Sequence, residues 1–191
     1  LGQIRTGAAS GVATRHMARE DASTIGLIGA GNQAITQLTA VCAVRPIRSI
    51  KAFSRTQERR EEFCQRMSQL LGIEVSPVST AKEAVQGTDV VIAITNVRTL
   101  DPVLLGEWLE PGMHINAAGA NSITRRELDD AAVTRSAIIV ADAWDQAKLE
   151  CADLAVPISS GLLDWDRVLE LGQVVTGQTP GRTNDEEITL F

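Results

Sequence analysis

The chain has 191 residues, the size of one domain or of one domain and a fragment. Hydrophobic residues make up 44% of it and charged residues 22%, which excludes a disordered chain. The net charge is −6 and no basic block occurs, which argues against nucleic-acid binding and against an anionic membrane surface.

Signals for membrane insertion, export and metal binding are missing from the sequence. Charged or polar residues interrupt every apolar run before the ~18 residues that a membrane span needs. The sequence begins at Leu1 without an initiator Met or a signal-peptide region, so we interpret it as the middle of a longer chain. Its three cysteines are widely spaced and the aspartates are dispersed, so we expect no metal site, a reducing environment and a cytoplasmic location.

Apolar spacing and glycine positions predict helices and strands in alternation. Residues 6–18 are rich in alanine and have apolar residues at helical spacing, which predicts a first helix. A short apolar run at 24–29 predicts a buried strand. The elements predicted after it are a helix at 31–44, a strand at 49–54, a helix at 56–72, a strand at 73–78, a short helix at 79–87, and strands at 89–95, 113–117 and 137–141.

This order predicts a fold class. Strands that alternate with helices over short connections form a parallel sheet with helices on both faces. We therefore expect an α/β protein with a Rossmann-type, doubly wound and mostly parallel sheet. After Ala141 the alternation fades, and the sequence ends on an apolar run at 188–191, which a chain end rarely leaves in water.

A glycine-rich loop lies between the first predicted strand and the next helix. Residues 29–34 read Gly-Ala-Gly-Asn-Gln-Ala, the G-x-G-x-x-A form of the dinucleotide-binding fingerprint. Gly29 permits a tight turn, and Gly31 lets the backbone approach a pyrophosphate at the helix N-terminus. The alternative is a glycine turn that only reverses the chain, and the strand–loop–helix context favours the dinucleotide.

The end of the second predicted strand bears on which dinucleotide binds. An NAD-binding protein usually has an Asp or Glu about 20 residues beyond the loop, where it binds the ribose 2′-hydroxyl. Here that place reads Ser54-Arg55-Thr56, with Arg59 nearby, and guanidinium groups suit a 2′-phosphate. We therefore predict NADP(H) as the preferred cofactor and NAD(H) as the alternative. Both arginines could instead be solvated surface charges.

Two further places in the chain bear on the site. Thr95 and Asn96 follow the fourth predicted strand, where open α/β sheets bind ligands. His114 alternates within an apolar strand, so we interpret it as a core histidine and not as a catalytic base.

Short motifs along the whole chain resemble those of the ornithine cyclodeaminase/mu-crystallin family. They are, in order, Arg5-Thr-Gly-Ala-Ala-Ser-Gly11, Gly29-Ala-Gly31, Ser54-Arg-Thr56, Gly106-Glu-Trp108, Pro111-Gly-Met-His-Ile-Asn116, Arg126-Glu-Leu-Asp129 and Glu187-Ile-Thr-Leu-Phe191. Family members are longer and have a second domain that binds substrate and forms a dimer. The resemblance implies that this chain is the nucleotide-binding middle portion, with the second domain largely absent.

The resemblance also implies roles for single residues. Arg5 would bind the substrate α-carboxylate, and Asn121 occupies the place of an Asp that engages the substrate amine in ornithine cyclodeaminases. An amide is neither a general base nor a negative charge, which disfavours ornithine cyclisation. The full set of expected cofactor contacts is Thr6, Gly29, Gly31, Asn32, Gln33, Ser54, Arg55, Thr56, Arg59, Thr95, Asn96 and Ala118.

The function that this implies is the NAD(P)-binding domain of an oxidoreductase. The enzyme would reduce an imine or ketimine, or interconvert an amino acid and its 2-oxo acid, with hydride from nicotinamide C4. The alternatives are an ornithine cyclodeaminase that forms proline and ammonia with bound NAD, and a non-catalytic nucleotide-binding module of the mu-crystallin type. Expected partners are a small imino, amino or oxo acid and, in the full-length protein, a second copy in a homodimer.

The expected organisation of the chain has three parts. Residues 1–20 form a helix that leads in from the second domain, and residues 21–160 form the Rossmann domain. Residues 161–191 return toward the second domain, and without that domain the apolar end would be exposed; the alternative is that Leu190 and Phe191 fold back onto the sheet. The segment by itself is expected to be inactive.

Overall fold

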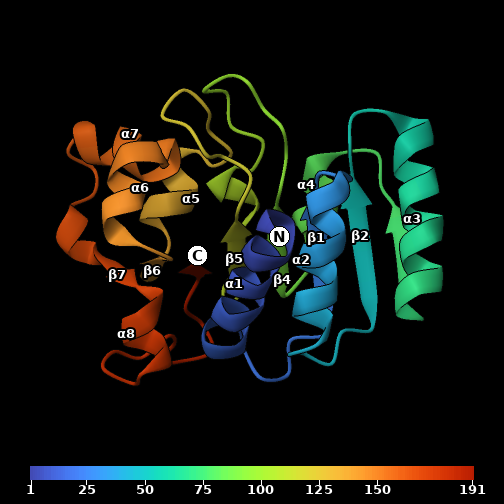
Figure 1. The fold of residues 1–191 in the computed structure, drawn as a ribbon, viewed down its shortest axis with the longest axis horizontal. Coiled ribbons are helices and arrows are strands. Elements are labelled where there is room, and N and C mark those ends of the chain that lie inside the picture. The colour runs from blue at the N-terminus through green and yellow to red at the C-terminus, as the bar shows by residue number, and fades with distance from the viewer.

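The sheet has eight strands in the order β3-β2-β1-β4-β5-β8-β6-β7, and every pairing is parallel. It is seen in a computed structural model that describes residues 1–191 (Figure 1). The strands are β1 Thr24–Ile28, β2 Ser49–Phe53, β3 Glu74–Pro77, β4 Val90–Ala93, β5 His114–Ala117, β6 Ile138–Ala141, β7 Val168–Glu170 and β8 Thr189–Leu190. The predicted Rossmann-type α/β fold is confirmed.

Eight α-helices and two short 3-10 helices connect the strands. The helices are α1 Gly2–Met17, α2 Asn32–Cys42, α3 Gln57–Leu71, α4 Ala81–Val85, α5 Asp130–Thr134, α6 Trp144–Glu150, α7 Ala152–Ser159 and α8 Leu171–Val175, with η1 Gly106–Trp108 and η2 Trp165–Arg167. None of them combines the length and the apolar character that crossing a bilayer requires.

Strand alternation sends side chains to two separate cores, one on each face of the sheet. Ile25 and Leu27 of β1 belong to the core under α2 and α3, whereas Ile28 belongs to the core on the opposite face, with residues of α4, α5 and α7. Each core contains 17 buried residues. Two cores of equal size are what a doubly wound sheet requires, because both of its faces must be covered.

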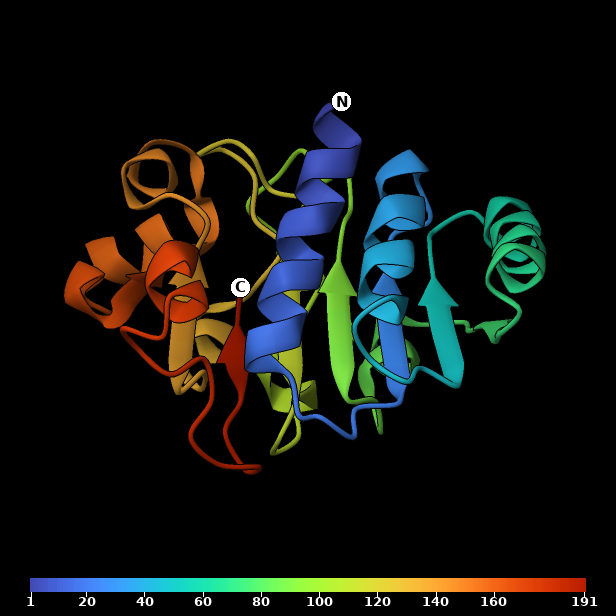
Figure 2. The ribbon, with the colours of Figure 1, turned by 60° about the horizontal axis from the view of Figure 1, so that its bottom comes forward.

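Helix α1 lies beside α2 on one face of the sheet, and its N-terminus points to the edge where the strands end (Figure 2). Gly7 and Gly11 allow this close approach. A Cβ atom at Gly7 would lie 2.7 Å from the carbonyl oxygen of Thr36, and one at Gly11 would lie 2.9 Å from the Cβ of Ala40. The helix begins at Gly2 and not at residue 6 as expected, and the hydroxyl of Thr36 bonds the carbonyl of Gln3 in its first turn.

The C-terminal run folds back onto the sheet, which is the second of the two expectations for it. Residues 189 and 190 form β8, which lies between β5 and β6 in the same sheet. Thr189 and Leu190 are buried, and the N–H of Phe191 donates to the carbonyl of Ile115. The sequence did not predict β7 and β8, because two or three residues are too few to show a period. Residues 161–191 therefore contribute two strands to the sheet that residues 21–160 begin.

Candidate functional site

The order of strands reverses at one point in the sheet. The chain runs from β1 outward to β2 and β3, and then returns to the other side of β1 as β4. Open α/β sheets bind ligands at such a point, outside the carboxyl ends of the strands. The glycine-rich loop follows β1 at that edge.

Gly29 is required by the backbone at the start of this loop. Its φ of +111° lies in a region that side-chain-bearing residues rarely adopt, and a Cβ atom there would collide with the carbonyl oxygen of Ile94. Its N–H donates to the carbonyl of Phe53 at 2.8 Å. Gly29 therefore ties the loop to the ends of β2 and β4.

Gly31 serves a different purpose from Gly29. It is the N-cap residue of α2, has an ordinary φ of −93°, and a Cβ atom placed on it would meet only open space. No side chain caps the helix and its first turn contains no acidic residue, so its free N–H groups face that space. Asn32 and Gln33 are exposed there, and Ala34 packs into the core. This cradle fits a pyrophosphate group.

The segment after β2 presents the predicted adenosine contacts at the surface. Arg55, Thr56 and Arg59 are exposed, and Thr56 is the N-cap of α3 without a hydrogen bond from its side chain to the helix. Arg60, which the sequence did not single out, is buried and donates to the carbonyl of Ser54 at 2.7 Å. Its guanidinium also lies 5.7 Å from the centre of the Phe53 ring. Arg60 therefore shapes this segment, and a pair of adjacent arginines gives no sequence signal of which one is buried.

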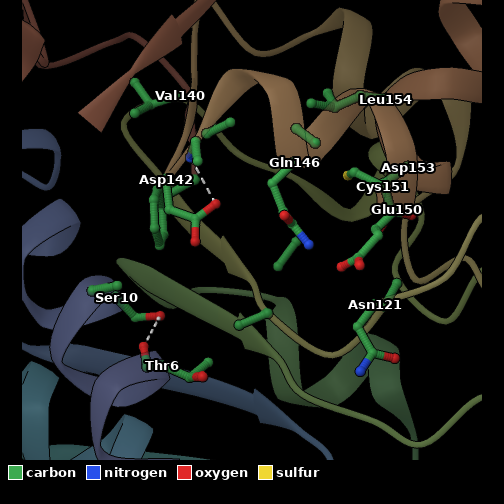
Figure 3. Close-up of a pocket in the computed structure, with 18 of the residues that line it drawn as sticks. Thr6, Ser10, Asn121, Val140, Asp142, Gln146, Glu150, Cys151, Asp153 and Leu154 are labelled. Carbon is green, nitrogen blue, oxygen red and sulfur yellow. Dashed lines mark hydrogen bonds between the residues drawn. The ribbon is translucent and has the colours of Figure 1, made fainter. Parts of the chain in front are cut away.

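A cleft of about 650 Å³ opens at the same edge of the sheet, between α1 and α6 (Figure 3). Of the residues predicted from the sequence, it brings together Arg5, Thr6, Ala118 and Asn121. The predicted residues that do not line it are Gly29, Gly31, Asn32, Gln33, Ser54, Arg55, Thr56, Arg59, Thr95 and Asn96.

The opposite wall of the cleft was not predicted. Gln146 and Glu150 extend from α6 into the hollow, across from Thr6 and Ser10 of α1 (Figure 3). These two residues are exposed and one helical turn apart, like any solvated pair on a short helix, so the sequence held no signal for them.

A buried carboxylate lies behind this edge. Glu127 is fully buried, and its Oε1 accepts hydrogen bonds from the N–H of Thr95 at 2.6 Å and from its hydroxyl at 2.5 Å. The other oxygen, Oε2, accepts from the N–H of Gly119 at 2.7 Å. Burial raises the pKa of Glu127 to about 7, and the charge of Asp153 adds to the increase, while the bonds from Thr95 and Gly119 oppose it.

Asp153 joins this carboxylate to the cleft. It lies on α7, lines the cleft, and accepts hydrogen bonds at 2.8 Å from the backbone N–H groups of Glu127 and Leu128. Burial raises its pKa to about 6. Neither acid was predicted as a site residue. Glu127 lies in the Arg126–Asp129 motif without a sign of burial, and Asp153 in the first turn of α7 has the pattern of an ordinary surface acid. Their burial and the backbone N–H groups that they bind become visible only in the folded structure.

His114 has no place in the cleft, in agreement with its interpretation as a core residue. It is fully buried, and its Nδ1 lies 2.9 Å from the hydroxyl of Thr189. Burial lowers the pKa of His114 to about 3, so the ring is neutral near neutral pH.

Comparisons with known proteins agree with this geometry. The sequence model of the ornithine cyclodeaminase/mu-crystallin family matches residues 1–191. A Δ1-pyrroline-2-carboxylate reductase from Bacillus cereus is 39% identical over 192 residues, which are 100% of this chain and 58% of that protein. The ketimine reductase mu-crystallin of Mus musculus is 34% identical over 187 residues, 98% of this chain and 55% of that protein.

The fold is also similar to solved structures. The Δ1-pyrroline-2-carboxylate reductase of Thermococcus litoralis, solved in complex with NADH and L-proline, has a TM-score of 0.95 and 41% identity, and the match covers 100% of this chain and 58% of that one. The chain thus spans a little more than half the length of the proteins that it matches.

Proposed function

The chain belongs to the ornithine cyclodeaminase/mu-crystallin family, and from this premise we propose that it is the dinucleotide-binding part of an enzyme that reduces the C=N bond of a small imino acid. The observation that carries the proposal is the bare N-terminus of α2 at Gly31, whose open space lies at the same edge of the sheet as the cleft. The names of the relatives support the substrate class, since all three are reductases of imines and one of them was solved with NADH and L-proline.

The residues at this edge divide into three groups by the part of the cofactor that each would hold. The pyrophosphate would lie against Gly29, Gly31, Asn32 and Gln33, and the adenosine ribose against Ser54, Arg55, Thr56 and Arg59. The nicotinamide half would lie toward β4 and β5, against Thr95, Asn96, Ala118 and Thr6 of α1. A nicotinamide cofactor, when bound, supplies the hydride of the reaction.

Two residues of the cleft would act on the substrate. Arg5 is exposed at the start of α1, and its guanidinium can hold both oxygens of a carboxylate through paired N–H donors. Asn121 offers one amide acceptor and two donors, which suit the orientation of an imine nitrogen or a water molecule. Arg5 would therefore fix the carboxylate end of the substrate while Asn121 orients the reacting end.

We also propose that NADP(H) is preferred over NAD(H). The segment after β2 has no carboxylate at 54–56 and exposes the cations of Arg55 and Arg59, which would pair with a 2′-phosphate. Glu58 in the first turn of α3 is the nearest opposing charge in the sequence. Titration of the protein with NADPH and with NADH tests this preference, and equal affinities would contradict it.

The enzymatic proposal is tested with the complete protein. We expect oxidation of NADPH with cyclic imino acids such as Δ1-pyrroline-2-carboxylate, and a panel of 2-oxo acids with amines would detect an amino-acid dehydrogenase instead. Formation of proline and ammonia from ornithine would identify a cyclodeaminase, which Asn121 disfavours because it carries no charge. Tight cofactor binding without any turnover would indicate a binding module.

A further inference from the structure

The connections after β4 and β5 run side by side at the carboxyl edge of the sheet. They meet in a parallel bridge between Leu104 and Leu128, where the N–H groups of Val103 and Leu104 also donate to the carbonyl of Glu127. Nearer to the site, Thr95 and Gly119 follow the two strands directly, and both donate to the side chain of Glu127. One side chain therefore links the two loops just beyond the paired ends of β4 and β5.

The two carboxylate oxygens of Glu127 bind different loops. Oε1 accepts both donors of Thr95, and Oε2 accepts the N–H of Gly119. Because each oxygen binds a different loop, the carboxylate connects the loops beyond the point where the β4–β5 ladder ends. Gly119 makes this approach feasible, since a Cβ atom there would collide with Glu127.

No cation accompanies this buried charge. The donors that reach Glu127 are neutral, and the charged group that affects it is Asp153 on α7, which is acidic as well. Arg126 donates to Asp130 and acts on Asp153. A buried carboxylate without a cation disfavours folding, so its presence here is better explained by the geometry that it imposes than by stability.

We propose that Glu127 is a positioning residue, which holds the loops after β4 and β5 in the arrangement that receives the nicotinamide half of the cofactor. This inference rests on the dinucleotide-binding function proposed above. Glu127 would act through Thr95 and Gly119 and would not touch the cofactor itself.

Protonation of Glu127 would weaken its hydrogen bonds to Thr95 and Gly119. All three hydrogen bonds place a donor against an acceptor oxygen, and a protonated carboxyl has one hydroxyl that must donate, so at least one bond is lost or reversed. The pKa of about 7 puts this change near neutrality. The loops would therefore be ordered above that pH and loosened below it, with Asp153 on α7 as the neighbouring titratable group.

The experiment compares Glu127→Gln with wild type by two independent measurements. An amide keeps the size of the side chain but turns one end into a donor, which faces either Thr95 or Gly119. We expect the dissociation constants of NADH and NADPH to rise roughly tenfold or more, and the amide-exchange protection of Thr95 and Gly119 to fall. In wild type the affinity one pH unit below the pKa of Glu127 should be lower than the affinity one unit above it. In Glu127→Gln the two affinities should be equal.

Glu110→Gln is the matched control. Glu110 also accepts a hydrogen bond from a glycine N–H, that of Gly87 at 3.0 Å, but at the opposite edge of the sheet. We expect it to leave cofactor affinity and the protection of Thr95 unchanged. Thr95→Val removes one of the three bonds and keeps Glu127, so its effect on affinity should be smaller in the Glu127→Gln background than in wild type.

The outcomes separate this inference from the proposed function. Unchanged protection of Thr95 and Gly119, unchanged affinity, or additive effects of the two substitutions would each overturn the role of Glu127. If Glu127→Gln does not fold, the wild type alone tests the role of Glu127. Equal cofactor affinities above and below the pKa of Glu127 would overturn that role. A folded wild type that binds neither NADH nor NADPH would overturn the proposed function, and with it the role assigned here.

Discussion

At the amino edge of the sheet, Asp89 accepts hydrogen bonds from the N–H groups of Ser23 at 2.8 Å and Thr24 at 3.0 Å, and from the hydroxyl of Thr24 at 2.8 Å. At the carboxyl edge, Glu127 accepts from two N–H groups and a threonine hydroxyl in nearly the same pattern. The difference lies in the surroundings. Arg19 pairs with Asp89, whereas Glu127 has no cation and is completely buried.

The two acids consequently titrate in opposite directions. Partial burial raises the pKa of Asp89, but the bonds from Ser23 and Thr24 and the charge of Arg19 outweigh it and lower the value below 3.8. Burial dominates at Glu127, whose pKa rises to about 7. The bonds and the ion pair at the amino edge stabilise the charged form of Asp89, whereas at the carboxyl edge burial disfavours the charge of the side chain that we propose as a positioning residue.

The largest expected effect belongs to Gly31→Val. The added side chain enters the open space at the N-terminus of α2, so NADPH affinity should fall by more than roughly 100-fold, about 3 kcal/mol. Because φ is −93° and nothing crowds the position, the free energy of unfolding should change by less than about 1 kcal/mol. Isothermal titration and urea denaturation measure the two quantities. Retained affinity would show that the loop has only a structural role.

Asp89→Asn should give the reverse pattern. It leaves Arg19 with only the exposed carboxylate of Asp21 and turns one acceptor of residue 89 into a donor, so the free energy of unfolding should fall by about 2–3 kcal/mol. Because folding lowers the pKa of Asp89, its contribution to the free energy of unfolding is present above pH 3.8 and is lost as the pH falls through the pKa of the folded state. The difference in stability between wild type and Asp89→Asn should therefore decrease in acid. Cofactor affinity should not change. A loss of affinity without a loss of stability would contradict the assignment of Asp89 to the stability of the fold.

The raised pKa of Glu127 predicts how the stability of the fold depends on pH. A carboxyl whose pKa rises on folding binds its proton more tightly in the folded state. The free energy of unfolding should therefore increase as the pH falls from about 7 to 4.5, by about 2–3 kcal/mol from Glu127. Urea denaturation at several pH values should show a steeper dependence in wild type than in Glu127→Gln. Equal slopes would mean that Glu127 titrates at its ordinary pKa.

Arg55→Asp should have the smallest effect. The guanidinium is exposed after β2, and its replacement by a carboxylate should reduce NADPH affinity by ~1–3 kcal/mol while NADH is largely spared. Competition between the two dinucleotides for wild type and variant measures the change. An equal loss of affinity for both cofactors would indicate altered folding of the segment. Unchanged NADPH affinity would show that Arg55 is only a solvated surface charge.

Much of the architecture follows from local sequence patterns. The alternation of apolar strands and helices predicts the parallel sheet, because strand and helix periodicities differ and short connections leave few topologies. The pair Gly29 and Gly31 is equally local, since a tight turn and a close ligand approach each require glycine at one position. The motif around Arg5 predicts a residue that lines the cleft in the structure, as Asn121 does.

The tertiary structure decided what depends on contacts between distant segments. Strand β8 has two residues and forms only because β5 and β6 offer it free backbone groups on both sides, so no sequence period could reveal it. Arg60 differs from Arg59 only in the face of α3 that it occupies. Glu127 looks like a surface acid in the sequence, and its hold on Thr95 and Gly119 exists only because 32 and 8 residues of chain fold back on it. Burial of a charge is a property of the packed chain, which no local pattern encodes.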